Sequence, residues 1–476
     1  MSGLASLNLK GKPKRLAMYQ ALYQQIRDQI LGGHLSPGAR LPSSRSLAAE
    51  MACSRGSVER AYELLSAEGF ITAKGAAGTR VNPELDQQLI ASGVAGASTD
   101  KFSKPKRHIM EPSIRPLQLG LPALDAFPRK LWNRLINRNA RSISADQLGS
   151  NSPFGYPPLR QAITNYLAIS RGVVCEPQQV FITSGFQGAL TVIAQTLGQS
   201  GEQVWCEDPG YFRARNCFQQ LGFSIESVPV DQDGMCISEG IKMAPTAKFA
   251  LVTPTHQSPL GVTLSLKRRM ELLQWAESSG SWIIEDDYDS EFRYGEKPLP
   301  ALKSLDGHNR VIYTGSFSKV LIPSLKLGYI VVPNELRPCF EQSFSSLWSV
   351  GSLLEQKVVT EFMVNGHFSL HIKKMRRLYG ERRAALANAL EKQLPRELSV
   401  SLQAGGMHLI GELLNTINEK FLLQRAQELG LAPHLLSSFQ INTKKPPALL
   451  LSFTNVEVAS AESVVEKLAQ AIYASQ

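Results

Sequence analysis

An alternation of strand-like and helix-like runs constrains the fold of this chain more than any other feature. From Arg115 onward, short runs rich in β-branched and aromatic residues alternate with helical stretches. The strand candidates are Val180–Thr183, Gln203–Glu207, Phe249–Pro254, Trp282–Asp286, Val311–Gly315 and Leu327–Val332. Such alternation is typical of an α/β domain with a largely parallel sheet. The tail, about Phe362–Gln476, combines a long charged helix over Phe368–Leu394 with shorter strands, which predicts a smaller α+β subdomain.

The N-terminal segment follows a different pattern. Apolar residues at helical spacing predict a helix over Tyr19–Leu31. A serine N-cap behind Pro42 predicts a second helix, and Ser54 is expected to cap a third. Two short strands are expected within Ile71–Val81. Two short helices joined by a tight turn and followed by a two-stranded wing are typical of a winged helix-turn-helix.

Positive charge is concentrated in the same segment. The chain carries a formal net charge of +10 over 476 residues. Residues 1–81 contain 11 Lys plus Arg against 5 Asp plus Glu, a difference of +6. A basic segment of this kind is the electrostatic footprint expected of a nucleic-acid-binding domain, although a merely solvated surface would have the same charge.

The third predicted helix is where base contacts are expected. The N-terminal residues of a recognition helix enter the major groove, and here they are Ser54, Arg55 and Ser57. Arginine can give bidentate hydrogen bonds to guanine, and serine can bond a base edge or a phosphate. Further DNA contacts are expected from Arg40, Ser44, Arg45 and the wing residue Lys74. For Arg60 we favour an ion pair with Glu63 on the same helix.

Residues 23–81 resemble the DNA-binding domain of the GntR superfamily. The motif L-x-PG-x-x-LPS-x-R-x-LA, followed by SR-x-x-V-x-x-AY-x-x-L-x-x-EG, is long and without gaps. The resemblance implies that Arg40, Arg45, Arg55 and Ser57 contact double-stranded DNA. The turn reads Ala52-Cys53 where the family usually has Gly-Val, a change we interpret as conservative.

Four segments at the carboxyl ends of strand candidates carry reactive or ligand-binding groups. Thr183–Ala189 (TSGFQGA) opens a helix, and a glycine-rich helix N-terminus favours a phosphate. Glu207–Tyr211 offers an aromatic ring for stacking. Trp282–Tyr288 ends in acids, which is an unusual end for a strand unless a cation lies nearby. Tyr313–Lys319 puts a lysine just past a strand.

These groups are the ones that pyridoxal 5'-phosphate requires. The cofactor needs a lysine for its aldehyde, a carboxylate for its pyridine nitrogen and backbone N–H groups for its phosphate. The order of the segments resembles fold-type I aminotransferases over about 360 residues. Together with the GntR-like head, the pairing of EDDYDSEFRY with GSFSK resembles the MocR subfamily of transcriptional regulators. This implies a winged helix-turn-helix over 16–82, a linker over 83–114 and an aminotransferase-like effector domain over 115–476.

The resemblance implies a role for each cofactor residue. Lys319 would form the aldimine, Asp286 would face the pyridine nitrogen, and Tyr288 would bond the phenolic oxygen. Tyr211 would stack on the ring. The phosphate would be held by Gly185, Phe186, Ser316, Ser318 and Lys326.

Three further residues are candidates near the cofactor. His256 fits the family's loop beside the cofactor, but it fits equally well a hydrogen-bonded core histidine. Arg213 is a candidate anion clamp for an effector, and His408 is a candidate lining residue of the effector pocket. Asp287 and Asp289 are interpreted as structural.

Three departures from the family pattern argue against efficient transamination. Leu450 stands where these enzymes usually have an arginine that binds the substrate α-carboxylate, so a bidentate salt link is lost. Lys326 replaces a phosphate-binding arginine, which keeps the charge but not the planar fork. Ser150 replaces a tyrosine that reaches the phosphate from the partner subunit.

We therefore predict a PLP-dependent DNA-binding regulator that senses PLP or a small amino compound at Lys319. The alternatives are an active aminotransferase with an accessory DNA-binding domain, and a DNA-binding protein whose large domain is only a dimerisation scaffold. The resemblance implies a homodimer with each head lying over its partner's large domain, and a cytoplasmic location is expected. The six scattered cysteines predict reduced thiols, and neither a metal site nor a membrane span is expected.

Overall fold

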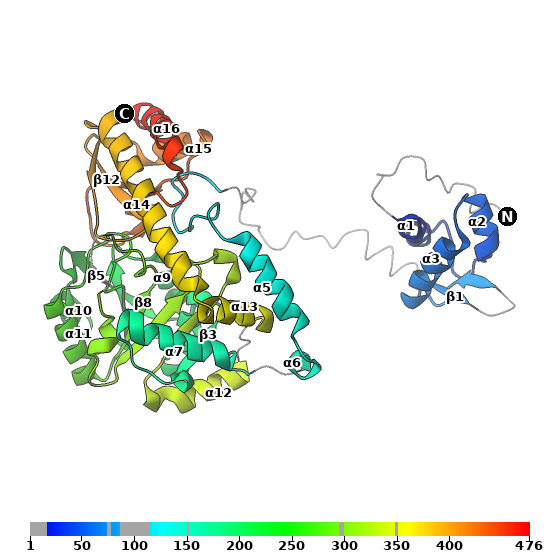
Figure 1. Ribbon diagram of the computed structural model, residues 1–476, viewed down its shortest axis with the longest axis horizontal. Helices are drawn as coiled ribbons and strands as arrows, with labels where there is room; N and C mark the ends of the chain where they lie inside the picture. Colours follow the sequence, from blue (N-terminus) through cyan, green and yellow to red (C-terminus); the bar gives the residue numbers. More distant parts are fainter. Residues whose placement is uncertain (1–16, 74–77, 86–113, 150–151, 295–298, 348–350) are drawn as a thin grey trace. The chain divides into compact units, whose positions relative to one another are not determined.

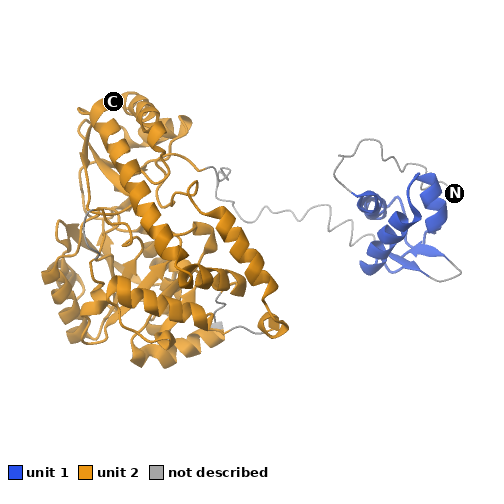
Figure 2. Ribbon diagram, in the orientation of Figure 1, with its two compact units in different colours: residues 1–111 blue, residues 112–476 orange. Residues whose placement is uncertain are grey.

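The chain divides into two compact units, residues 1–111 and 112–476 (Figure 2). The computed structural model describes residues 17–73, 78–85, 114–149, 152–294, 299–347 and 351–476. Most of the predicted linker over 83–114 lies outside these residues.

Within its described residues, the first unit contains three helices and a two-stranded wing. The elements are α1 (Met18–Leu31), α2 (Ser44–Glu50), α3 (Arg55–Ala67), β1 (Ile71–Ala73) and β2 (Thr79–Val81). The two strands pair antiparallel. Ser43 and Ser54 cap α2 and α3, because each side chain accepts a hydrogen bond from the backbone N–H three residues on. A separate apolar core joins the helices to the wing, so the predicted winged helix-turn-helix is confirmed.

The turn between α2 and α3 corrects one interpretation. Ala52 has a φ of 48°, in the left-handed region that a Cβ atom disfavours. The family's glycine adopts this conformation without that cost, so alanine here is not a conservative change in the turn. The strain is of order 1–2 kcal/mol.

The second unit is organised around an eight-stranded sheet in the order β3-β10-β9-β8-β7-β4-β5-β6. Its strands are β3 (Val180–Thr183), β4 (Gln203–Asp208), β5 (Ser224–Asp231), β6 (Gly234–Met235), β7 (Phe249–Val252), β8 (Trp282–Asp287), β9 (Val311–Ser316) and β10 (Gly328–Val331). Only β10 and β6 run antiparallel to their neighbours. Every residue of β3, β7 and β10 is buried, which is typical of a sheet covered on both faces.

Helices cover both faces of this sheet (Figure 1). One face packs on α5 (Arg129–Arg141), α7 (Pro157–Arg171), α10 (Ile237–Met243), α11 (Leu266–Ser279) and α13 (Leu353–Val364). The other face packs on α8 (Gly185–Leu197), α9 (Phe212–Gln220) and α12 (Arg337–Leu347). Alternate residues of each strand serve the two layers, as Ile283 and Ile284 of β8 do.

A smaller α+β subdomain follows, as predicted. The helix α14 (His367–Gln393) leads into an antiparallel sheet of order β11-β12-β14-β13. Its remaining elements are β11 (Leu398–Ser401), β12 (His408–Leu413), α15 (Glu419–Glu428), β13 (His434–Leu435), β14 (Ala448–Ser452) and α16 (Ala461–Tyr473). Buried residues of α14, α16 and the sheet form its core.

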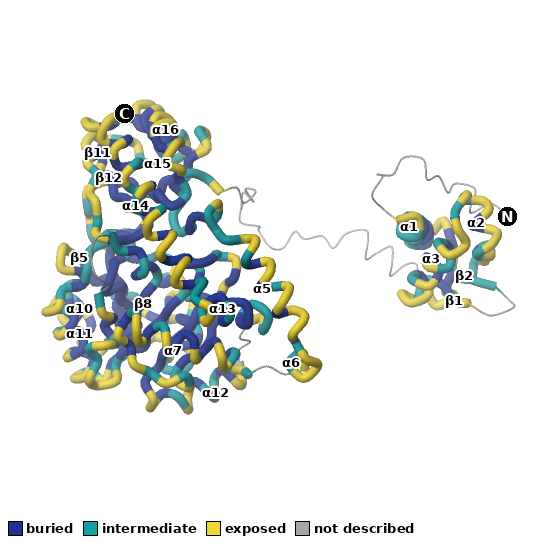
Figure 3. The backbone as a smooth tube through the Cα atoms, in the orientation of Figure 1, coloured by how far each residue is buried: buried dark blue, intermediate teal, exposed yellow. Residues whose placement is uncertain are grey.

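The candidate site residues follow the carboxyl ends of β4, β8 and β9. Parallel strands bring such ends to one edge of a sheet, where ligands bind in open α/β folds. The strands lie in the buried centre of the unit (Figure 3). Within the described part of the chain, no helix is both long and apolar enough to cross a membrane.

Candidate cofactor site and nucleic-acid interface

Lys319 lies just beyond β9 with its ammonium group at the centre of the site. Its Nζ donates a hydrogen bond to the carbonyl oxygen of Gly120, at 2.9 Å. Burial lowers the pKa of Lys319, and the nearby carboxylates of Asp289 and Asp286 only partly oppose this effect. A lowered pKa leaves a larger fraction of neutral amine, which is the form that attacks a carbonyl group.

Asp286 is a buried carboxylate at the end of β8. Burial, and then the charges of Asp287 and Glu207, raise its pKa well above the ordinary value. The charge of Lys319 acts in the opposite direction. Because the protein disfavours the ionised form of Asp286, a cation placed beside it, such as a protonated pyridine nitrogen, would strongly stabilise the carboxylate.

Asp287, the next residue, has a different role. Its Oδ2 accepts hydrogen bonds from Arg171 Nε at 2.6 Å and from the Tyr313 hydroxyl at 2.5 Å. Burial alone would lower the pKa of Arg171, but the charge of Asp287 and those of the neighbouring acids together outweigh this effect and raise it. The cation that the acidic end of this strand required is therefore Arg171, which the sequence analysis missed because it is 116 residues away.

Tyr288 and His256 lie together. Nδ1 of His256 is 2.9 Å from the Tyr288 hydroxyl and 3.1 Å from Asp289 Oδ2. The imidazole is buried, and a Cβ atom on Gly406 would lie 2.2 Å from it. His256 is thus a buried, hydrogen-bonded histidine in contact with Tyr288, and its role beside the cofactor stays a prediction.

An anion cradle lies where α8 begins. Gly185 has a φ of 71°, and no side chain caps the helix N-terminus. The backbone of Lys326 lies beside Gly185, 3.7 Å from where a Cβ atom would stand. Ser316 ends β9, and its Oγ accepts a hydrogen bond from the Ser318 N–H at 3.2 Å. These groups supply backbone N–H donors, hydroxyls and an exposed cation.

Tyr211 and Arg213 lie at the start of α9. The ring of Tyr211 is 6.3 Å from the ring of Phe186. Arg213 is exposed, and its guanidinium lies 5.8 Å from the ring centroid of Phe212. Its charge also lowers the pKa of Lys319, so its field reaches the reactive amine.

The predicted effector region is apolar where β14 passes. Leu450 is fully buried and is paired with Ile410 on β12 and His434 on β13. The cluster around it consists of Ile410, Leu436, Phe439, Ala448 and Leu450, with Leu119, Tyr211, Phe212 and Leu260 packed against it. Nε2 of His408 donates a hydrogen bond to Pro259 O at 2.9 Å, and burial lowers the pKa of His408 to about 4, so it is neutral at pH 7.

The roles of two buried acids at the end of β4 also escaped the sequence analysis. Glu207 bonds Thr253 and Gln257, and burial raises its pKa to about 7. Asp208 accepts three backbone hydrogen bonds at 2.8–2.9 Å from residues 441–443 of the smaller subdomain. No sequence signal joins positions more than 230 residues apart, so only the fold reveals this link.

In the first unit, the predicted DNA contacts lie on and around α2 and α3. Arg45 and Arg55 are exposed, and Arg55 pairs with Glu59 at 2.7 Å. Ser54 and Ser57 share a 2.8 Å hydrogen bond. Arg40, also exposed, has its side chain 3.3 Å from where a Cβ atom on Gly78 would stand. Ser44, partly buried, donates to Glu59 at 3.3 Å.

Three further residues named in the sequence analysis have different outcomes. Arg60 pairs with Glu63 at 3.0 Å, as predicted. Lys74 and Ser150 lie outside the described residues.

The family described as "Aminotransferase class I and II" matches residues 129–472, and "Bacterial regulatory proteins, gntR family" matches residues 18–81. A probable rhizopine catabolism regulatory protein, MocR of Rhizobium meliloti, is 34% identical over 96% of this chain and 94% of its own length. The pyridoxine biosynthesis regulator PdxR of Corynebacterium glutamicum is 29% identical over 95% of each chain. Pyrococcus horikoshii kynurenine aminotransferase, solved with PMP, is 28% identical, with a TM-score of 0.68 over 80% of this chain and 99% of its own.

Proposed function

Because this chain belongs to the class I and II aminotransferases, and among them to the MocR-type regulators with a gntR-family head, we propose that Lys319 is its sensing residue. The protein is a DNA-binding transcriptional regulator, and its large unit is a pyridoxal-phosphate domain. The finer proposal concerns what the regulator detects and which residues take part.

The arrangement of charged groups in the site fits the cofactor. When bound, pyridoxal phosphate supplies an aldehyde that condenses with a primary amine and a ring that withdraws electrons. Lys319 supplies a buried amine of lowered pKa, and Asp286 supplies a carboxylate that a ring cation would satisfy. The uncapped start of α8 supplies N–H donors for a phosphate. The observation that carries the proposal is the position of the Lys319 amine, held at 2.9 Å from the Gly120 carbonyl just past β9, with the buried carboxylate of Asp286 at the end of the neighbouring strand β8.

We propose that the effector is either the cofactor or a small amino compound that competes with Lys319 for it. Arg213 and His408 are the proposed effector contacts, the first as a cation and the second as a neutral imidazole. A ligand can shift the DNA-binding equilibrium only if it binds two states of the protein unequally. We propose little aminotransferase turnover, because an apolar side chain, Leu450, stands where a carboxylate clamp would be needed.

The proposed active form is a homodimer with each head domain over its partner's large domain, acting in the cytoplasm where its DNA lies. Sedimentation of the full-length protein with and without DNA measures the oligomeric state. A monomeric complex at saturating DNA would contradict this part of the proposal.

The test of the function is a gel shift with promoter DNA in four conditions: apo protein, cofactor, cofactor with a candidate amine, and the Lys319→Ala variant. We expect cofactor or amine to change the apparent Kd of the wild-type protein and to leave that of the variant unchanged. Thermal unfolding of the variant serves as the control for folding. If the variant keeps both the visible absorbance of bound cofactor and the DNA response, Lys319 is not the sensing residue.

A further inference from the structure

A second basic surface lies on the large unit, on helix α5. The helix runs from Arg129 to Arg141 and contains five Arg or Lys residues and no Asp or Glu. All five basic residues are exposed. Its buried side consists of Trp132, Leu135 and Asn139, so the helix is anchored by one face and leaves the opposite face to solvent.

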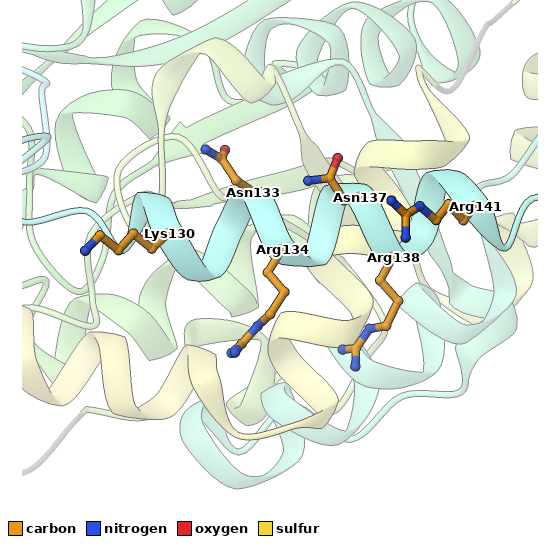
Figure 4. Close-up of a pocket in the computed structure, with 6 residues that line it drawn as sticks. All are labelled: Lys130, Asn133, Arg134, Asn137, Arg138 and Arg141. Carbon is orange, nitrogen blue, oxygen red and sulfur yellow. The ribbon is translucent and has the colours of Figure 1, made fainter.

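The exposed face combines cations with amides. Its residues are Lys130, Asn133, Arg134, Asn137, Arg138 and Arg141, which line one shallow surface depression (Figure 4). We call this set the α5 basic face. At about 100° per residue, Lys130, Arg134 and Arg141 project within about 40° of one another around the helix axis. Arg138 is set apart because it pairs with Glu361 of α13.

We propose that the α5 basic face binds the sugar–phosphate backbone of double-stranded DNA outside the segment read by the winged helix-turn-helix. Lys130 and Arg141 are separated by about 16 Å along the helix, at about 1.5 Å per residue. A duplex of that length carries about ten phosphate charges, at one per about 1.7 Å of axis. Arginine, lysine and asparagine side chains are the groups that proteins commonly use to contact phosphates.

Charge complementarity and side-chain type favour DNA over other occupants. A membrane-binding helix would expose large apolar residues at the water boundary, and α5 exposes none. The centre of a protein interface is typically enriched in aromatic residues and methionine, which this face lacks. The gntR-family head binds DNA, and the large unit belongs to the same chain, so a bound duplex raises the effective concentration of phosphate for the large unit.

The test compares three forms of the full-length protein. One is the wild type, and the second is the triple variant Lys130→Gln/Arg134→Gln/Arg141→Gln. The third is a matched control that removes three exposed cations from the smaller subdomain, Arg396→Gln/Lys420→Gln/Lys467→Gln. Fluorescence anisotropy with a labelled duplex several helical turns long gives the Kd at a series of salt concentrations. Thermal unfolding and cofactor absorbance confirm that each variant is folded.

We expect the α5 variant to bind about tenfold or more weakly than the control at 0.1 M salt. Its slope of log K against log salt should fall by up to about 3, because each lost phosphate contact removes about 0.9. On a duplex shortened to one recognition site, the two variants should bind alike. Equal slopes for the two variants on the long duplex would overturn the inference while leaving DNA binding by the head intact.

Two other probes test the alternative occupants. Poly-glutamate represents an acidic protein segment, and phosphatidylserine vesicles represent an anionic membrane. If the α5 variant loses binding to either probe but keeps wild-type duplex binding, the face serves that occupant and the inference is wrong. If the wild-type protein binds no duplex, both this inference and the DNA-binding function fail.

Discussion

The side chain of Lys319 is held against the backbone of Gly120, 2.9 Å from its carbonyl oxygen. Gly120 has a φ of 80°, and a Cβ atom there would lie 2.6 Å from the lysine Nζ. The segment before the sheet thus fixes the reactive amine that follows β9, and only glycine allows the approach.

We therefore predict that Gly120→Ala displaces the amine and weakens cofactor binding by about tenfold or more, equivalent to about 1.4 kcal/mol. Titration of the apo protein with pyridoxal phosphate, followed by visible absorbance, measures this. Gly366→Ala is the matched control, since its φ is 75° and a Cβ atom there would meet nothing within 4 Å. Both variants carry the left-handed strain, but only the first has the clash. Equal affinities of the two variants would contradict the prediction.

The sequence predicted those helices and strands whose signals lie in a short stretch of neighbouring residues. The strand Val180–Thr183 was predicted with the bounds that β3 has, because a fully apolar run followed by a glycine-opened helix is a local pattern. The pairing of β10 antiparallel to both neighbours was not predicted, since strand direction depends on the path of distant connections. The strain at Ala52 was likewise invisible, because φ is set by how α2 and α3 pack.

The same division holds within the site. Lys319 and Asp286 were predicted from strand ends, where residue type and position are informative. The partners Gly120 and Arg171 were not, because each contact joins segments that meet only after the sheet is assembled. The acids of Trp282–Tyr288 indicated that a cation was needed, but not which cation.

Removing one partner of the buried ion pair between Arg171 and Asp287 is expected to lower the free energy of unfolding strongly. Arg171→Ala would leave the buried carboxylate of Asp287 with the Tyr313 hydroxyl as a donor but without its cation. We predict a loss of about 3–5 kcal/mol in the free energy of unfolding. Denaturant unfolding measures it, with Arg377→Ala as control because its pair with Glu381 is exposed and should contribute less than about 1 kcal/mol. Similar losses in the two variants would show that burial does not set the strength of the pair.

His408 is expected to make stability depend on pH. Burial lowers its pKa to about 4, below the value of about 6.5 in an unfolded chain. Between these values the unfolded state binds more protons, so the free energy of unfolding falls as pH drops from about 6.5 to 4. The full contribution is up to about 3 kcal/mol.

Glu207 affects stability with the opposite pH dependence, because its pKa is raised to about 7. Its contribution to the free energy of unfolding declines as pH rises from about 4.5 to 7.

The His408→Gln variant separates these two contributions, since glutamine keeps an N–H for the Pro259 carbonyl but does not titrate. Chemical unfolding at a series of pH values from 4 to 7 should show less loss of stability in acid for the variant than for the wild type. Glu207→Gln should change the curve in the reverse direction. A His408→Gln curve parallel to that of the wild type would mean that His408 titrates normally in the folded protein.

Leu450 is expected to determine whether amino acids react at the site. It is fully buried beside Ile410 and His434, in a cluster that includes the partly buried Tyr211. An arginine there could pair with an α-carboxylate, so Leu450→Arg should speed the spectral change that an L-amino acid produces in the holoprotein. Leu450→Met conserves volume and should give no increase. The idea fails if the arginine variant keeps its cofactor spectrum and thermal midpoint yet reacts no faster than the methionine variant.

Arg55 and Arg60 lie on the same helix, and they provide a matched pair for the DNA interface. Both form ion pairs within α3, Arg55 with Glu59 and Arg60 with Glu63. Arg55 is the first residue of the helix, so its side chain can exchange Glu59 for a guanine edge when the helix N-terminus enters the major groove. Arg60 lies a turn further along.

We predict that Arg55→Ala weakens binding to a specific promoter duplex by about 1–3 kcal/mol and reduces discrimination against a scrambled duplex. Arg60→Ala should lower both affinities slightly and equally. Anisotropy titrations with the two duplexes measure this discrimination, and a larger loss of specificity in Arg60→Ala would show that the helix enters the groove with a different face.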